Sequence, residues 1–350
     1  MSHGGNVWFS GAPDQWLDYS ANIRPGGAPE WVRRALEEGM KNAAYYPDPE
    51  MRRAKSALAE YLNMPKDWVL PTAGGISAID MASHLSSGTV FTFSPCFEEY
   101  KRQSLNRPRK VSSIPVLRGR EILSPAECAR GRLEKGCLAY LCSPMNPVGA
   151  AFDPSDILSL LREVESVQGY LAVDEAFVAY CPHRSVRHLI ADHPRLMVLG
   201  SMTKILGIPG VRLGYFLAQE EIIGQLKRFQ LTWELNCFAE QVACALPGHG
   251  AEIEADAREN ARRREEMRGA LQGLGCFVYP SEASFLLTDL NRPAAPVMAY
   301  LKARGILTRW CTDFEGLEDG RHLRLAVKDE SSNRRLIETL KEAFACAENR

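Results

Sequence analysis

The chain contains no continuous apolar run of about 18 residues, the length that a membrane-spanning helix requires. Its first residues also lack the basic segment followed by an apolar stretch that marks a secretory signal. Together these absences predict a cytoplasmic protein that has neither a membrane partner nor a membrane anchor.

The ten cysteines include no Cys-x-x-Cys pair and no Cys/His cluster at zinc spacing, so the sequence predicts no metal site. Scattered thiols of this kind suit a reducing compartment. The formal net charge is only −1, and the short basic run at 262–264 is followed by two glutamates in a helical pattern. This pattern indicates a solvated helix face rather than a nucleic-acid-binding patch.

What is present is a normal globular composition, 45% hydrophobic and 24% charged, over 350 residues, enough for two domains. Short apolar runs alternate with helical patterns between about residues 50 and 230. This alternation predicts a mostly parallel sheet covered on both faces. A long helical stretch near 248–274 follows, and an α+β pattern after it predicts a compact C-terminal domain. The runs lie at 88–93, 137–142, 170–173, 196–200 and 214–217.

One stretch near the fourth run suits a phosphorylated aldehyde. Lys204 follows Ser201 and Thr203, and Arg212 lies eight residues further on in a glycine-rich loop. A lysine amine can form a Schiff base with an aldehyde. Hydroxyl groups and an arginine fork can bind a phosphate. The alternative is an ordinary lysine beside a turn.

Polar residues also follow two earlier strands. Asp174 ends an apolar run, where a buried carboxylate needs a cationic partner such as a pyridinium N–H; the alternative is a helix N-cap. Asn146, in a proline-braced turn, could donate a hydrogen bond to a ring oxygen, although Asn-Pro also marks plain turns. Ligands on such sheets gather at the carboxyl ends of the strands.

Two weaker signals precede these residues. Gly74 and Gly75 open a helix whose N-terminus could bind an anion. Phe97 could stack on a planar ring, although alone it would read as a core residue. Asn146, Asp174, Lys204 and Arg212 then follow at spacings of 28, 30 and 8 residues. The order as a whole indicates pyridoxal 5'-phosphate (PLP) chemistry.

With these motifs, the chain resembles fold-type I PLP enzymes of the class I and II aminotransferase family over nearly its whole length. Within that family it resembles the histidinol-phosphate aminotransferase branch, and above all the threonine-phosphate decarboxylases of cobalamin biosynthesis. Four of their motifs have counterparts here. The chain matches their His-Gly-Gly-Asn opening at 3–6 and their Leu-Asp-Phe-Ser-Ala-Asn-Ile run at 17–23. It matches their Asp-Glu-Ala-Phe motif at 174–177 and their Ile-Pro-Gly-Leu-Arg-Leu-Gly-Tyr motif at 208–215.

The resemblance implies an α/β fold of the aspartate-aminotransferase type. A large domain would hold a mostly parallel sheet of about seven strands, and a smaller α+β domain would accompany it. The implied division is an N-terminal arm with part of the small domain at 1–45, a large PLP-binding domain at 46–250 and the C-terminal small domain at 251–350.

The resemblance also implies roles for individual residues. Lys204 would carry PLP, Asp174 would pair with the ring nitrogen, Asn146 would bind the ring oxygen and Phe97 would stack on the ring. The phosphate would contact Gly74, Gly75, Ser201, Thr203 and Arg212. Tyr46 would reach the cofactor phosphate of a partner subunit, which implies a homodimer. Arg324 would bind the substrate α-carboxylate, and the remaining substrate residues would be His3, Asn22, Arg24 and Arg309.

The implied reaction is decarboxylation of L-threonine O-3-phosphate to (R)-1-amino-2-propanol O-phosphate and carbon dioxide. Alternatives are a histidinol-phosphate aminotransferase, a decarboxylase that prefers phosphoserine and a non-catalytic PLP-fold protein. The His-Gly-Gly opening and Phe177, where the aminotransferases usually have tyrosine, favour the decarboxylase. Arg24 and Ser284 depart from the decarboxylase pattern, which has asparagine at the first position and commonly at the second, and this leaves the exact substrate open.

Overall fold

The computed structural model describes residues 4–8 and 12–348. Its centre is a seven-stranded sheet in the order β2-β10-β9-β8-β7-β3-β4. Its strands pair in parallel except β10, which is antiparallel to both of its neighbours. The sheet is therefore mostly parallel, as predicted. The strands are β2 (Val69–Thr72), β3 (Val90–Ser94), β4 (Val111–Pro115), β7 (Leu138–Cys142), β8 (Tyr170–Asp174), β9 (Leu196–Ser201) and β10 (Gly214–Leu217).

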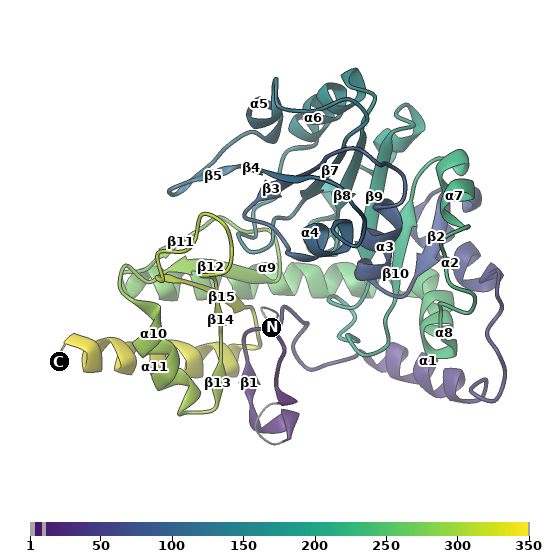
Figure 1. Ribbon diagram of the computed structural model, residues 1–350. Helices are drawn as coiled ribbons and strands as arrows, with labels where there is room; N and C mark the ends of the chain where they lie inside the picture. Colours follow the sequence, from purple (N-terminus) through teal and green to yellow (C-terminus); the bar gives the residue numbers. More distant parts are fainter. Residues whose placement is uncertain (1–3, 9–11, 349–350) are drawn as a thin grey trace.

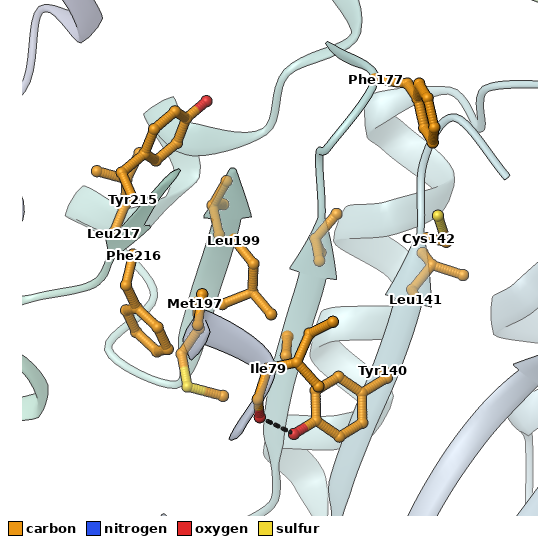
Figure 2. Close-up of a cluster of buried hydrophobic side chains, with 14 of the residues drawn as sticks. Ile79, Tyr140, Leu141, Cys142, Phe177, Met197, Leu199, Tyr215, Phe216 and Leu217 are labelled. Carbon is orange, nitrogen blue, oxygen red and sulfur yellow. Dashed lines mark hydrogen bonds between the residues drawn. The ribbon is translucent and has the colours of Figure 1, made fainter. Parts of the chain in front are cut away.

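Most strands of this sheet are buried along their whole length, which explains their nearly continuous apolar sequences. Figure 2 shows part of the resulting core, in which Leu141, Leu199 and Phe216 project from three different strands. The helices of this region are α1 (Glu30–Met40), α2 (Arg52–Leu62), α3 (Gly75–Ala82), α4 (Glu99–Ser104), α5 (Pro125–Ala129), α6 (Pro154–Ser166), α7 (Glu220–Leu226) and α8 (Cys237–Ala245).

Local sequence explains several helix starts. Asp153 caps α6 by accepting a hydrogen bond from the Ser155 N–H, and Asn236 caps α8 in the same way. Pro154 occupies the first position of α6, where a missing N–H costs nothing. Short 3-10 segments connect the larger elements: η2 (Pro13–Gln15), η3 (Lys66–Trp68), η4 (Val178–Tyr180), η5 (Pro182–Arg184), η6 (Arg187–Ala191) and η7 (Leu246–His249).

A second, smaller sheet has the antiparallel order β11-β12-β15-β14. The N-terminal strand β1 (Leu17–Asp18) pairs separately, in parallel, with β13 (Ile306–Leu307). Residues 306–310 form two short strands, because the chain changes partner from β1 to β15 at Thr308. The remaining elements are β11 (Phe277–Val278), β12 (Phe285–Asp289), α10 (Ala294–Lys302), β14 (Arg309–Trp310), β15 (His322–Ala326), α11 (Glu330–Glu348) and the hairpin β5 (Leu117–Arg118) and β6 (Glu121–Ile122).

The long helix α9 (Gly250–Gly273) joins the two parts of the molecule, and Figure 1 shows it running from beneath the large sheet to the small one. Ile253 packs into the core of the large sheet, whereas Met267 and Leu271 pack into the core of the small sheet. The helix thus belongs to both cores. The domain boundaries at 45 and 250 stay predictions, and the second falls where this shared helix begins.

The basic run at 262–264 lies on the outer part of α9. Arg262 forms ion pairs with Glu259, Glu266 and Glu330, so its charge is balanced on the helix surface. Within residues 4–8 and 12–348, no helix has both the length and the apolar character that crossing a membrane requires. The same residues contain no cluster of three or more His, Cys, Asp or Glu side chains that could hold a metal ion.

Candidate active site

The carboxyl edge of the large sheet gathers most of the residues singled out by the sequence. Strands β7, β8 and β9 end at Cys142, Asp174 and Ser201, and the polar residues that follow them lie at one edge because the strands are parallel. Strand β10 runs the opposite way, and its first residue, Gly214, pairs with both Ser201 and Thr72. The antiparallel strand therefore brings Arg212, which precedes it, to this same edge.

Lys204 lies in the turn after β9, and the N-terminal arm contacts it, since the Arg24 N–H donates to the Lys204 carbonyl at 3.1 Å. Burial, and after it the charges of Arg324 and Arg212, lower the pKa of the Lys204 amine to about 8 against the opposing attraction of Asp174. The neutral amine is therefore more populated near neutral pH than it is in an ordinary lysine. A neutral amine is the form that attacks an aldehyde.

Asp174 is a buried carboxylate at the end of β8, only 6% exposed. Its Oδ1 accepts a hydrogen bond from the Ala176 N–H at 2.9 Å, and its Oδ2 accepts one from the Tyr100 hydroxyl at 2.6 Å. Burial raises the pKa of Asp174, while Tyr100, Ala176 and Lys204 act to lower it. The helix N-cap alternative does not hold, because the described helix nearest along the chain, η4, begins at Val178 and has no side-chain cap.

Asn146 and Arg324 meet although they come from different parts of the molecule. The Arg324 Nη1 donates to the Asn146 Oδ1, and its Nη2 donates to the Ser20 carbonyl at 2.7 Å. The Arg324 Nε is buried without a hydrogen-bond partner. Burial is the main reason that the pKa of this guanidinium falls to about 10. A buried cation with an unused donor is suited to binding an anionic ligand.

The expected phosphate-binding residues form one cluster. Gly74 precedes α3 with a φ of 81°, and a Cβ at this position would lie 2.4 Å from the Arg212 Nη2. Only glycine can therefore hold this turn against the arginine. The Cβ of Ser201 lies 3.7 Å from where Gly75 would carry a Cβ, and the Ser201 and Thr203 hydroxyls are 2.9 Å apart. The N-terminal N–H groups of a helix have no partner inside the helix.

Two aromatic side chains follow strands of the same sheet. Phe97 lies partly buried after β3, with its ring edge-on to that of Tyr100 at 5.9 Å between centroids. Phe177 is buried after β8 and contacts Phe285 of the small sheet at 5.0 Å. Because Phe177 packs on the small sheet, its ring joins the two parts of the molecule, and no hydroxyl is present there to bond a ring oxygen.

The expected substrate residues are more dispersed. Asn22 is buried, and its Oδ1 has no hydrogen-bond partner. Arg309 and Arg324 are directly paired across β14 and β15, so the two guanidinium groups belong to neighbouring residues. Arg309 also forms a bidentate ion pair with Asp313 at 2.8 and 2.7 Å.

Arg24 contacts α9 rather than the Arg324 group. Its Nε and Nη2 bind the Asp256 carboxylate at 2.8 and 3.0 Å, and its Nη1 donates to the Gly27 carbonyl. Arg24 and Asp256 line a cavity of about 430 Å³ beside Ile205. A role for Arg24 in binding substrate therefore requires that it leave Asp256.

His3 lies outside the described residues, but its neighbour Gly4 is described and reaches the site. A Cβ at Gly4 would lie 2.0 Å from the Ser20 carbonyl oxygen and 3.2 Å from the Arg324 Nη2. The Gly5 N–H donates to the Ser20 hydroxyl at 2.8 Å. The N-terminal segment therefore lies against Arg324, and the small size of Gly4 makes this close approach possible.

Tyr46 lies away from this group within its own chain. It is 79% exposed and stacks on Trp233 at 4.4 Å between ring centroids. Nearby along the loop, Leu231 is also exposed, at 77%. Exposed aromatic and aliphatic side chains of this size are typical of surfaces that contact another protein.

Sequence reasoning missed two residues of the site. Tyr100 follows Phe97 by three residues, and this helical spacing could have revealed it. Glu234 accepts hydrogen bonds from the Ala73 N–H, at 2.9 Å, and from the Ser77 hydroxyl, so its carboxylate lies at the start of α3. No local signal links it to residues 157 and 161 positions earlier.

The fold and this edge define the class: a PLP-dependent enzyme built on the aspartate-aminotransferase fold. The family model described as aminotransferase class I and II matches residues 14–340, and the chain belongs to this family. It is 31% identical to the threonine-phosphate decarboxylase of Salmonella typhimurium, over 98% of this chain and 96% of that protein. It is also 31% identical to the histidinol-phosphate aminotransferase of Symbiobacterium thermophilum, over 92% of this chain and 89% of that protein.

The fold comparison agrees with the sequence comparison. The crystal structure of the histidinol-phosphate aminotransferase from Clostridium acetobutylicum matches with a TM-score of 0.85 and 26% identity, covering 93% of this chain and 98% of that one. The predicted family, fold class and cofactor are thereby confirmed: the cofactor is PLP. The residues present fit it, because a buried lysine, a buried carboxylate and a glycine–arginine cradle lie at one edge of the sheet.

Proposed function

We propose that this protein is a PLP-dependent carboxy-lyase that converts L-threonine O-3-phosphate to (R)-1-amino-2-propanol O-phosphate and carbon dioxide. The product would serve the assembly of a cobamide. The observation that carries the proposal is the position of the N-terminal arm, whose Gly4 lies against the Ser20 carbonyl and Arg324. The arm thus contributes residues to the proposed substrate-binding side of the site, next to Arg324.

In this proposal the large domain holds the cofactor. Lys204 would bond its aldehyde carbon, Asp174 would face its ring nitrogen, Asn146 its ring oxygen and Phe97 the plane of its ring. Bound PLP supplies an electron sink conjugated with the substrate Cα. Its phosphate would be held by backbone N–H groups, hydroxyls and one guanidinium, from Gly74, Gly75, Ser201, Thr203 and Arg212.

The substrate of this reaction carries two anionic groups, a carboxylate and a phosphate, close together. Two arginines paired across neighbouring strands, Arg324 and Arg309, suit such a molecule. Arg324 has the buried, unused Nε donor and is assigned to the carboxylate. Arg309, with Asn22, His3 and Arg24 as further candidates, is assigned to the phosphate side.

Arg324 also bears on which bond breaks. A bond to Cα is weakened when it lies perpendicular to the plane of the conjugated system, so the placement of the carboxylate decides between loss of carbon dioxide and loss of a proton. Arg324 bonds Asn146, the residue proposed to contact the ring oxygen, and this link fixes the carboxylate-binding group relative to the ring plane.

Transamination of histidinol phosphate is the second candidate, because relatives of both names have equal identity to this chain. Histidinol phosphate has a phosphate but no carboxylate, so it would leave Arg324, the arginine assigned to the carboxylate, without an anionic group of the substrate to bind. Phosphoserine is a third possibility, since one methyl group changes binding by only about 1–3 kcal/mol.

One experiment separates these candidates. The holoenzyme is incubated with phosphothreonine, phosphoserine or histidinol phosphate, each with and without 2-oxoglutarate, while carbon dioxide and glutamate are measured. We expect carbon dioxide from phosphothreonine without the keto acid. Glutamate formed from histidinol phosphate, with no carbon dioxide from either amino acid, would replace the lyase assignment with the aminotransferase.

A second experiment tests the arm. Removal of residues 1–6 should raise the KM for phosphothreonine and leave PLP content unchanged. As a matched control, Gly4→Ala adds one methyl group where the Ser20 carbonyl leaves no room, and should raise KM without shortening the chain. An unchanged KM in both proteins would show that the arm does not help to bind substrate.

We also propose that the enzyme is a cytoplasmic homodimer. The exposed pair Tyr46 and Trp233 supports the dimer, with Tyr46 contacting the cofactor phosphate of the partner subunit. The ten free cysteines are consistent with a reducing compartment. Light scattering should give twice the chain mass, and Tyr46→Ala should weaken PLP binding. A monomer with full PLP affinity would contradict the assignment.

A further inference from the structure

Tyr100, on α4, lies next to the carboxylate assigned to the cofactor ring nitrogen. Its side chain is fully buried, and its hydroxyl donates to the Asp174 Oδ2 at 2.6 Å. Its ring stacks on that of Tyr140, with 5.1 Å between centroids and 6° between planes, and meets Phe97 edge-on. The packing on both sides fixes the ring, so the hydroxyl is held on Asp174.

The acceptor arrangement of Asp174 leaves room for one further partner. Its Oδ1 is bonded by the Ala176 N–H and its Oδ2 by Tyr100. Each carboxylate oxygen has two lone pairs, so both can still accept a hydrogen bond from a ring N–H. The titratable groups that interact with Asp174 come from several elements: Tyr100, Cys142, Glu175, Lys204 and Tyr215.

We propose that Tyr100 is a positioning residue that keeps the catalytic proton on the cofactor ring nitrogen by making Asp174 a weaker base. The proposal rests on the role of Asp174 toward the ring, and it holds for either the lyase or the aminotransferase. A proton shared between a carboxylate and a pyridine nitrogen has two positions. Only the position on nitrogen gives the ring the positive charge that stabilises a carbanion.

Burial alone favours the position of the proton on the Asp174 carboxylate. In a low-dielectric interior, a neutral carboxylic acid beside a neutral ring costs less than an ion pair. Burial accordingly raises the pKa of Asp174, and the largest opposing effect is the hydrogen bond from Tyr100. A donor bonded to the ionised carboxylate stabilises that form, which leaves the proton on the ring.

Tyr140 provides a matched control. Its side chain is also fully buried, and its ring is the one that stacks on the Tyr100 ring. Its hydroxyl, however, donates to the Ile79 carbonyl at 2.9 Å, as Figure 2 shows. Tyr100→Phe and Tyr140→Phe each remove one buried hydroxyl and keep the stacked rings. They differ in whether the lost bond was made to Asp174.

The experiment compares both variants, Asp174→Asn and the double variant Tyr100→Phe/Asp174→Asn as PLP-loaded proteins. Visible absorbance is recorded against pH, PLP affinity by fluorescence and kcat with whichever substrate the enzyme turns over. We expect Tyr100→Phe to lower kcat roughly 10- to 100-fold, as loss of a hydrogen bond to a charged group does, with PLP affinity changed by less than about 3-fold. Its yellow form should persist about one pH unit higher, because a less positive ring makes the lysine linkage more basic.

Tyr140→Phe should show neither the spectral shift nor the loss of kcat. In the Asp174→Asn background, loss of the Tyr100 hydroxyl should change kcat less than about 3-fold, since the carboxylate it acts on is gone. Equal spectra for Tyr100→Phe and Tyr140→Phe, or fully additive losses in the double variant, would overturn the proposal. Failure of the lyase assignment leaves these spectral readouts unaffected.

The cofactor-free proteins give a check in case a variant binds PLP poorly. Loss of the Tyr100 bond raises the pKa of Asp174 in the folded state further above its unfolded value. Stability is then lost as pH rises from the unfolded toward the folded pKa, because the folded state binds more protons. The stability deficit of Tyr100→Phe relative to Tyr140→Phe should therefore grow with rising pH, and a constant deficit would contradict the proposed contact.

Discussion

The sides of the site that we propose to face the cofactor and the substrate are built differently. Asn146 and Lys204 follow parallel strands of one sheet and Asp174 ends the strand between them, so the sheet itself sets their spacing. Arg309 and Arg324 lie on the small sheet, and the N-terminal arm completes their surroundings through Ser20 and Gly4. One side is built on a single sheet, while the other is assembled from the N-terminal arm and the small sheet, and its bonded residues Ser20 and Arg324 are 304 positions apart.

This difference separates two tasks. Cofactor chemistry depends on a lysine, a carboxylate and an amide held at fixed spacing, which a parallel sheet provides. Choice of substrate depends on the segments that meet only in the folded chain, where Arg324 bonds both Asn146 and Ser20. Changes on the first side should therefore abolish all reactions, whereas changes on the second should alter affinity and preference.

The largest expected effect is on the cofactor-facing side. Lys204→Ala should abolish covalent PLP attachment and lower kcat at least about 10³-fold, because the amine is both the attachment point and the proposed proton carrier. Lys55→Ala is the control, since Lys55 is also buried but pairs with Asp67 away from the site. Borohydride reduction followed by mass spectrometry reads the result; a PLP adduct persisting on Lys204→Ala would refute the assignment.

On the assembled side, Arg324→Lys should lower kcat/KM roughly 100-fold, because lysine cannot bond Asn146, Ser20 and a carboxylate at once. PLP affinity should stay within about 3-fold of the unmodified enzyme, since the fork of the arginine does not hold the cofactor phosphate. Steady-state kinetics and fluorescence titration measure the two quantities. A similar fall in kcat/KM and in PLP affinity would mean that Arg324 contributes to both substrate binding and cofactor binding.

The pH dependence of PLP binding tests the electrostatic environment of Lys204. With the pKa of Lys204 lowered to about 8 by burial and by Arg324 and Arg212, the rate of PLP capture by cofactor-free protein should rise with pH and reach half its maximum near 8. Asp174→Asn removes a charge that raises this pKa, so its midpoint should fall. A midpoint that rises, or stays put, in that variant would contradict the electrostatic account.

The smallest effect concerns Arg24 and Asp256. If Arg24 binds the substrate phosphate, Arg24→Ala should raise KM about 2- to 5-fold, while Asp256→Asn, which frees the guanidinium, should lower it. If the pair only ties the arm to α9, both variants should raise KM alike. Initial-rate measurements on the two variants distinguish these cases.

Asn146, Asp174 and Lys204 could be proposed from the sequence because each lies at or just after the carboxyl end of a recognisable apolar strand. The antiparallel direction of β10 could not be predicted, because its apolar composition matches that of the parallel strands. This direction nevertheless brings Arg212 to Gly74. The pairing of Arg24 with Asp256 joins residues 232 positions apart and has no local signal. Contacts between distant segments depend on how the two cores pack, which periodicity does not encode.

Helix α9 has a mechanical consequence. Its 24 residues make it about 36 Å long, and one end is embedded in each core. A rotation of about 5° at its first turn displaces the far end by roughly 3 Å, close to the whole length of a hydrogen bond. Any change in the direction of α9 near η7 would therefore also move the small-sheet core, into which Met267 and Leu271 pack.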